Sequence, residues 1–210
     1  MPGNDLALLI EAAHEAGRIA TAFVGGPLDM QDKPGGAGPV TAADLAVNAM
    51  LVEQLRAARP DYGWLSEETE DNAARLGAER VFIVDPIDGT RSFIEGNHDW
   101  AHSLAVVERG VVIAAAIYLP MRDKLYAAAA GHGATLNGVP IRATARADLV
   151  GASILASKPN YAAENWREGQ VPEMARAFRP SLAYRLSLVA EGRYDAMMTL
   201  RPSWEWDIAA

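Results

Sequence analysis

The chain has 210 residues, half of them hydrophobic, with a formal net charge of -8 and no cysteine. The lack of cysteine excludes disulfides, thiolate metal sites and thiol nucleophiles, and the acidic charge argues against a nucleic-acid polymer as partner. No apolar run approaches the roughly 18 residues of a membrane span and the N-terminus does not resemble a secretion signal, so we expect a cytoplasmic protein outside the membrane.

Two helices and a short strand are predicted in the first third of the chain. Apolar residues recur at helical spacing over residues 4–24, with Asn4 as a candidate N-cap. The glycines and prolines of residues 33–39 predict a loop. A second helix is expected over residues 41–59, and residues 62–65 predict a short strand. The residues expected on the buried face of the second helix are Leu45, Met50, Leu51 and Leu55.

The rest of the chain is predicted to be richer in strands. A continuous apolar run indicates a buried strand, and successive alternating segments indicate an antiparallel meander. Asn137-Gly138 is typical of a hairpin turn. The predicted elements are strands at 81–84, 103–107, 111–119, 125–130, 152–156 and 194–200, and a helix at 182–191 closed by Gly192.

This order of elements indicates layered α and β structure of the α+β class. Two helices come first, a strand meander follows, and strand and helix then alternate. We divide the chain into an N-terminal α+β subdomain, residues 1–135, which carries the candidate metal site, and a C-terminal α/β subdomain, residues 136–210.

The segment Asp85-Pro86-Ile87-Asp88-Gly89-Thr90 is the main candidate for chemistry. Asp85 ends a buried strand, where an unpaired charge costs several kcal/mol unless it is compensated or binds a metal. Pro86 and Gly89 favour a sharp bend that lets Asp85 and Asp88 converge. Thr90 begins a short predicted helix, whose N-terminus favours phosphate. Asp-Pro and Asp-Gly are also common turn dipeptides, so the segment alone favours a plain turn over a functional site.

Each of the other acids, considered alone, is explained more simply by a structural role. Glu67 and Glu68 follow an apolar strand, although adjacent acids usually mark a solvated turn. Asp44 lies three residues after Thr41, as in a helix capping box. Asp207 fits an acid at a helix start. Oxygen ligands without cysteine or paired histidines favour magnesium over zinc.

Taken together and in order, these motifs resemble the inositol monophosphatase superfamily of magnesium-dependent, lithium-sensitive phosphatases. The matching segments are Val40-Thr41-Ala42-Ala43-Asp44, Glu67-Glu68, Asp85 to Thr90, and Trp206-Asp207. The segments Pro60 to Thr69, Asp88 to Phe93 and Leu188 to Gly192 look most similar to its CysQ-type branch of 3′(2′),5′-bisphosphate nucleotidases. Arg91-Ser92 departs from the Thr-Thr or Thr-Asn of many members.

The resemblance implies a role for each matching residue. Glu67, Asp85 and the Ile87 carbonyl would hold one Mg²⁺, and Asp85, Asp88 and Asp207 a second, with a third, weaker ion shared by Glu67. Thr90, oriented by Asp44, would position and deprotonate the attacking water. The backbone amides of Gly89, Thr90 and Arg91 would hold the phosphate. Glu68 and Lys33 would lie behind the ligands.

The same resemblance implies an αβαβα sandwich of the inositol monophosphatase and fructose-1,6-bisphosphatase type. The chain stops three residues after Asp207, where family members continue, so its C-terminal part is expected to be truncated. Inositol 1-phosphate and 3′-phosphoadenosine 5′-phosphate are the leading substrates, with histidinol phosphate and fructose 1,6-bisphosphate as alternatives. A catalytically weak binding or regulatory member is an alternative of another class. The family is often dimeric, so a homodimer is open.

Several further residues are given structural roles at this point. His14, His98, His102 and His132 lack ligand spacing. Trp204 and Trp206 are expected to be packing residues rather than a substrate platform. The region of Lys158, Arg185 and Arg201 could contact a second anionic group of a substrate, although a solvated face is the simpler interpretation. With structural roles expected for these residues, the acids stay the candidates for chemistry.

Overall fold

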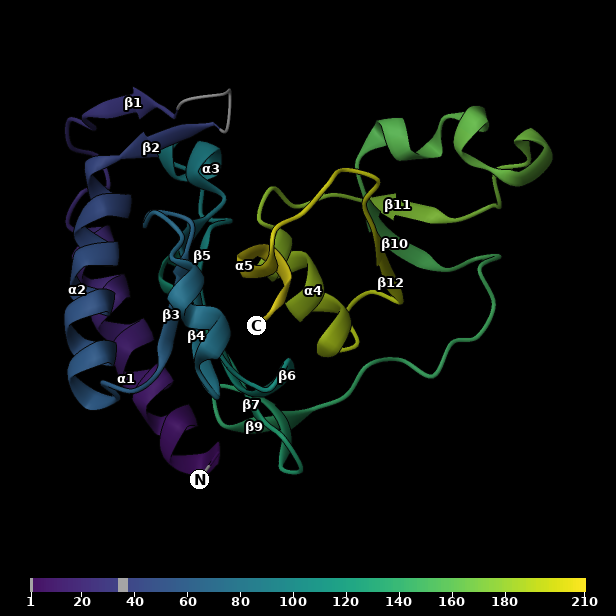
Figure 1. The fold of residues 1–210 in the computed structure, drawn as a ribbon. Coiled ribbons are helices and arrows are strands. Elements are labelled where there is room, and N and C mark those ends of the chain that lie inside the picture. Colours follow the sequence, from purple (N-terminus) through teal and green to yellow (C-terminus); the bar gives the residue numbers. More distant parts are fainter. Residues whose placement is uncertain (1, 34–37) are drawn as a thin grey trace.

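The computed structural model describes residues 2–33 and 38–210, and two helices open the fold. Helices α1 (Pro2–Thr21) and α2 (Ala42–Ala58) run antiparallel and cover one face of a seven-stranded sheet (Figure 1). Helices α4 (Leu182–Ala190) and α5 (Glu205–Ile208) cover the other face, and a three-stranded sheet lies beyond α4. The predicted layering of α and β structure is confirmed.

The large sheet has the strand order β3-β4-β5-β6-β7-β8-β9. Only β3 and β4 are parallel, and every later neighbour is antiparallel, as the predicted meander requires. Its strands are β3 (Gly63–Ser66), β4 (Arg80–Asp88), β5 (Ala101–Glu108), β6 (Val111–Leu119), β7 (Lys124–Ala129), β8 (Gly133–Leu136) and β9 (Val139–Ile141).

The remaining strands form two small sheets. The first is a hairpin near α3 (Thr90–Ile94). The second is parallel throughout, in the order β11-β10-β12. Residues 34–37 of the predicted loop lie outside the described residues. The strands are β1 (Met30–Asp32), β2 (Pro39–Thr41), β10 (Ser153–Ala156), β11 (Ala175–Ala177) and β12 (Ala196–Met198), and the short 3-10 helices are η2 (Ala73–Gly77), η3 (Pro120–Arg122), η4 (Lys158–Tyr161), η5 (Ala163–Asn165) and η6 (Arg167–Gly169).

Packing of α1 and α2 on the large sheet makes the main core. Small residues on α1 allow close approach, and larger aliphatic and aromatic side chains fill the space between helices and strands. The fully buried members include Leu9, Val47, Leu51, Leu55, Phe82, Trp100 and Leu104. A second core lies between the other face of the sheet and α4 and includes Ile117, Leu119, Tyr126, Leu155 and Leu188.

Two local predictions about the helices were wrong. Asn4 lies inside α1 rather than at its N-cap, because the helix already begins at Pro2. Leu45 is 47% exposed, because the face of α2 that meets the core runs through Val47, Leu51 and Leu55 at four-residue intervals.

Other local predictions are confirmed with small shifts in their bounds. Thr41 caps α2 and forms a capping box with Asp44. Gly192 follows α4 with a φ of 74°. The strand predicted at 194–200 is shorter, at Ala196–Met198.

The chain passes from the large sheet to the small one through an exposed segment, residues 142–150 (Figure 1). Strand β8 spans the boundary predicted at residue 135, and β9 beyond it pairs within the same large sheet. The division into residues 1–135 and 136–210 stays a prediction. None of the helices in the described part of the chain is long and apolar enough to cross a lipid bilayer.

Candidate metal and phosphate site

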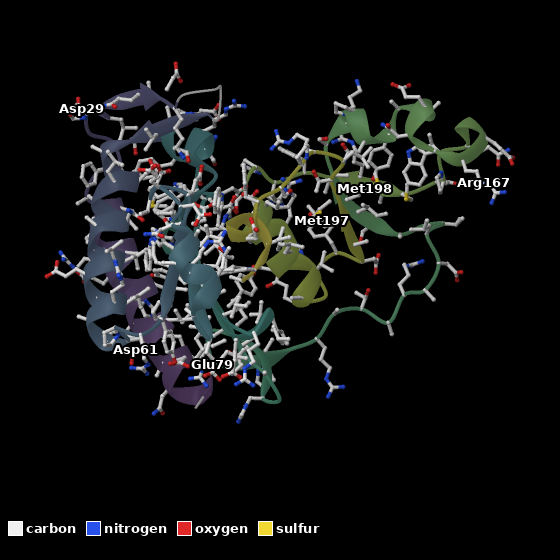
Figure 2. The ribbon with its side chains drawn as sticks, viewed as in Figure 1. Asp29, Asp61, Glu79, Arg167, Met197 and Met198 are labelled. Atoms are coloured by element: carbon white, nitrogen blue, oxygen red, sulfur yellow. The ribbon has the colours of Figure 1, made fainter. Side chains whose placement is uncertain are left out.

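The candidate site lies where the parallel strands β3 and β4 end. Because parallel strands share one direction, the residues that follow them reach the same edge of the sheet. Glu67 follows β3, and its amide donates to the Val84 carbonyl of β4 at 3.2 Å. Figure 2 shows Asp61 and Glu79, which precede these strands, at the opposite end of the sheet from α3. Acids at the carboxyl ends of β3 and β4 therefore converge, and those at the amino ends do not.

A bulge in β4 changes the directions of the Asp85 and Asp88 side chains. The pairing of β4 with β5 is regular up to Asp85 and shifts register between Asp85 and Asp88. Such a bulge re-aims side chains that a regular strand would send to fixed faces. His102 of β5 is fully buried and its Nδ1 donates a hydrogen bond to the Pro86 carbonyl, so it stabilises the backbone of the bulge. Burial lowers the pKa of His102 to about 4, which keeps the ring neutral.

Three carboxylates meet at the bulge. Oxygens of Asp85, Asp88 and Asp207 all lie within 4.8 Å of one another. Asp85 and Asp88 are buried, and Asp207 is half-buried. The turn after β4 predicted that Asp85 and Asp88 converge, and the family resemblance implied that Asp207 joins them. The structure brings together residues from the strand β4 and the helix α5, more than 100 positions apart.

The carboxylates do not compensate one another electrically. Burial, and then the charges of Glu67, Asp88 and Asp207, raise the pKa of Asp85 well above its usual range. Burial raises the pKa of Asp88 to about 6, against hydrogen bonds that lower it, and burial also raises that of Asp207. Asp85 Oδ1 is buried without a hydrogen-bond partner among the described residues. A buried, unsatisfied oxygen among acids is what a bound cation would satisfy.

Hydrogen bonds from α4 hold Asp88 in place. Asp88 Oδ2 accepts from the Ser181 hydroxyl and from the Ala183 amide, the latter at 2.8 Å. The sequence interpretation missed both residues. A serine directly before a helical run is an N-cap signal, and Ser181 does cap α4, but nothing in the pattern predicts its second contact.

Asp207 is fixed by its own helix and by β5. The Trp204 amide donates to Asp207 Oδ2 at 2.7 Å, and the Ser103 hydroxyl donates to the Trp206 carbonyl at 3.1 Å. Ser103 faces Asp85 across the β4–β5 ladder, so one residue of β5 links α5 to the bulge.

Glu67, Glu68 and Lys33 form a charged group beside the three aspartates. Lys33 Nζ lies 2.6 Å from Glu67 Oε1 and 2.6 Å from Glu68 Oε1. Although burial lowers the pKa of Lys33, its hydrogen bonds to the two glutamates raise it overall. Glu67 lies close enough to Asp85 for its charge to raise the pKa of that residue. The structure thus places Lys33 between the carboxylates of Glu67 and Glu68, and the supporting role expected of Glu68 and Lys33 stays a prediction.

Asp44 and Thr90 form a hydrogen-bonded pair at the other side of the bulge. Thr90 Oγ1 lies 3.4 Å from Asp44 Oδ1 and 3.2 Å from the Ile87 carbonyl, and can donate to either. Asp44 Oδ2 accepts from the Thr41 amide at 2.8 Å, so the capping box also orients the carboxylate. The capping and the catalytic interpretations of Asp44 are therefore compatible. Burial raises the pKa of Asp44, which makes it a stronger base.

The predicted phosphate cradle lies at the start of α3. Gly89 precedes the helix with a φ of 94°, and a Cβ there would lie 3.2 Å from the Asp99 carbonyl. Thr90 is the first residue of α3, and Arg91 the second, with an exposed side chain. Amides of a first helical turn lack intrahelical partners, so those of Gly89, Thr90 and Arg91 can bind an anion.

Cationic and aromatic side chains lie near Asp207. Arg185 of α4 is only 5% exposed, and within the described residues it forms no salt bridge. The positive charges of Arg201 and Arg185 act on Asp207 and lower its pKa against the larger effect of burial. Trp204 is 64% exposed, so the expectation that it packs inside was wrong for this residue.

The residues present fit Mg²⁺. They supply only hard oxygen donors, the group is negatively charged, and one buried oxygen lacks a partner. Asp85, Asp88 and Asp207 would hold one ion, and Glu67 with Asp85 could contribute to another. The number of ions stays a prediction.

The chain is similar to known proteins over nearly its whole length. A family model described as the inositol monophosphatase family matches residues 4–210. The inositol-1-monophosphatase of Rhizobium meliloti (strain 1021) is 34% identical over 215 residues, which cover 98% of this chain and 77% of that protein. A 3′-phosphoadenosine 5′-phosphate phosphatase of Mycobacterium leprae (strain TN) is 34% identical over 181 residues, covering 80% and 64%. The solved structure of extragenic suppressor protein suhB from Bartonella henselae matches with a TM-score of 0.85 and 30% identity, covering 99% of this chain and 82% of that one.

Proposed function

The chain belongs to the inositol monophosphatase family and has its layered α/β fold, and on this premise we propose that it is a Mg²⁺-dependent phosphatase that hydrolyses a small phosphate monoester. The observation that carries the proposal is the convergence of Asp85, Asp88 and Asp207 within 4.8 Å, next to the start of α3. Carboxylates that can bind a hard cation lie next to free helical amides, and a phosphate group binds to both the cation and the amides.

The residues divide the work of hydrolysis in this proposal. Bound Mg²⁺ supplies Lewis-acid stabilisation of the phosphate and lowers the pKa of water. The amides of Gly89, Thr90 and Arg91 hold phosphate oxygens. Thr90 Oγ1 takes a proton from the attacking water as it passes its own proton to Asp44 Oδ1, 3.4 Å away. Asp44 acts as the base, because Thr41 holds its Oδ2 and so orients its Oδ1 toward Thr90.

Among phosphate monoesters, inositol 1-phosphate and 3′-phosphoadenosine 5′-phosphate are the substrates we propose. Arg185 is a specific reason to include a substrate with two phosphates. A buried guanidinium without a salt bridge among the described residues is costly, and an anionic group of a substrate would compensate it. Its charge also acts on Asp88 and Asp207, so it lies near the metal ligands. A homodimer and a cytoplasmic location stay predictions.

A single assay tests the reaction and ranks the substrates. Phosphate release from inositol 1-phosphate, 3′-phosphoadenosine 5′-phosphate, histidinol phosphate and fructose 1,6-bisphosphate would be measured with Mg²⁺, with EDTA, and with Mg²⁺ plus LiCl. We expect release that requires Mg²⁺ and is inhibited by lithium.

The control compares two aspartates at opposite ends of the large sheet. We expect Asp88→Asn to abolish release and Asp61→Asn to retain it, because Asp61 is exposed and far from α3 (Figure 2). No release from any of the four esters by the unaltered chain would favour a binding or regulatory protein. Near-normal turnover of Asp88→Asn at saturating Mg²⁺ would contradict the site assignment.

A further inference from the structure

An exposed pair of stacked tryptophans adjoins the candidate metal ligands. The rings of Trp204 and Trp206 lie with their centroids 5.1 Å apart and their planes 15° from parallel. Trp204 is 64% exposed, although indole rings are usually well buried. Neither burial nor a hydrogen bond of the Trp204 ring among the described residues explains why this side chain is large and aromatic.

The backbone of this pair is hydrogen-bonded to the candidate ligand Asp207 and to Ser103, the ladder partner of Asp85. Trp204 caps α5, and its amide donates to Asp207 Oδ2 at 2.7 Å. The Trp206 carbonyl accepts from Ser103 of β5 at 3.1 Å. Trp204 is the N-cap of α5 and Asp207 is the third residue of that helix, so the exposed indole starts from the residue whose amide binds the candidate ligand. Stacking on Trp206 also limits the rotamers of Trp204, so the ring is held ready for a ligand.

Charge at the same place adds to the argument. Arg201, three residues before Trp204, is exposed, and its positive charge acts on both Asp207 and Arg185. The short segment thus presents a cation and a flat aromatic surface beside the candidate ligand Asp207. An aromatic face stacks on the planar base of any nucleotide, and a cation binds a second phosphate group.

We propose that Trp204, backed by Trp206, is a stacking platform for the planar base of a nucleotide whose phosphate lies at the metal ligands. Trp204 is thus a specificity residue that favours nucleotides over cyclitol phosphates, whose saturated rings have no π face. This assignment rests on the proposed phosphatase function and narrows its substrate class.

The test uses two esters that differ only in the base, AMP and ribose 5-phosphate, with Mg²⁺ present. The measured quantity is the ratio of kcat/KM for AMP to kcat/KM for ribose 5-phosphate. Trp204→Ala should lower this ratio roughly 5- to 150-fold, through the KM for AMP, since that is the usual effect of removing one stacked aromatic. Trp204→Phe should restore part of it. Leu76→Ala, a similarly exposed apolar residue on η2, should keep the original ratio.

Binding separates failure of the platform from failure of the phosphatase. If the unaltered chain hydrolyses neither ester, the proposed function fails, and titration calorimetry with the same two compounds then decides on the platform. Tighter binding of AMP than of ribose 5-phosphate, reduced in Trp204→Ala, supports it. An unchanged ratio, an equal loss on both esters, or equal binding of the two compounds overturns it.

Discussion

Replacing Asp85 by asparagine should stabilise the metal-free protein while destroying its function. Asp85 is fully buried, its Oδ1 has no hydrogen-bond partner among the described residues, and two further carboxylates lie within 4.8 Å. Asparagine keeps the shape, removes the charge, and can donate from its amide to a neighbouring carboxylate. The substitution therefore relieves repulsion without creating a cavity.

The magnitude follows from the geometry. Two charges at 4.8 Å repel by about 3.5 kcal/mol at an effective dielectric constant of about 20. The total cost to Asp85 is limited by the alternative of taking up a proton, which at pH 7.5 costs about 5 kcal/mol for an aspartate of ordinary pKa. We therefore expect Asp85→Asn to raise the free energy of unfolding of the metal-free protein by about 1 to 4 kcal/mol. For a chain of this size that is a rise in Tm of roughly 2 to 16 °C.

Thermal unfolding in EDTA and in millimolar MgCl₂ is the assay. The unaltered chain should gain stability from Mg²⁺, by about 2.7 kcal/mol at a concentration 100 times Kd, and Asp85→Asn should gain little. Asp61→Asn, which changes an exposed acid at the other end of the sheet, should follow the unaltered chain in both conditions. The reasoning is refuted if metal-free Asp85→Asn is no more stable than the unaltered chain, or if Mg²⁺ stabilises both equally.

Three further predictions concern pH, the catalytic pair and the fold. The carboxyl of Asp88 has a pKa of about 6 in the folded protein instead of 3.8, so the folded protein binds more protons than the unfolded chain. In EDTA, the free energy of unfolding should therefore fall by about 1 kcal/mol as the pH rises from 5 to 7, and Mg²⁺ should stabilise the protein more at pH 7 than at pH 5. Calorimetry showing the opposite trend would contradict the raised pKa of Asp88. Thr90→Val should lower kcat roughly 10²- to 10⁴-fold with little change in KM, and Thr90→Ser should retain most activity; equal rates for the two variants would exclude the hydroxyl's role. Asp5→Ala, which removes the buried partner of Arg59 and Tyr62, should cost about 2 to 4 kcal/mol in urea unfolding without changing KM, and a loss below 0.5 kcal/mol would show that this cluster is not stabilising.

The sequence predicted the acids of the site better than their surroundings. Asp85, Asp88 and Asp207 could be brought together by matching motif order, and the short helix after Gly89 follows from its turn chemistry. Ser181 could not be found in this way, because its bond to Asp88 joins residues 93 positions apart, and no local pattern encodes such a contact.

Exposure was the other quantity that local reasoning estimated poorly. Leu45 and Trp204 are large and apolar, so burial is the usual expectation, yet both are exposed. The face of a helix that meets the core is set by the neighbouring layers, which the spacing of apolar residues constrains only approximately. For Trp204, the departure from expectation led to the proposed nucleotide platform.

The contact between Asp88 and Ser181, and that between Ser103 and Trp206, have a consequence for how the protein reaches its native state. They close loops of 93 and 103 residues, so we expect the long-range pairing that completes the site to form slowly, after α4 and α5 have docked on the large sheet. The ligand set is complete only after nearly the whole chain has folded. The appearance of tight Mg²⁺ binding during refolding should therefore mark the last step, later than the formation of the α1–α2 layer.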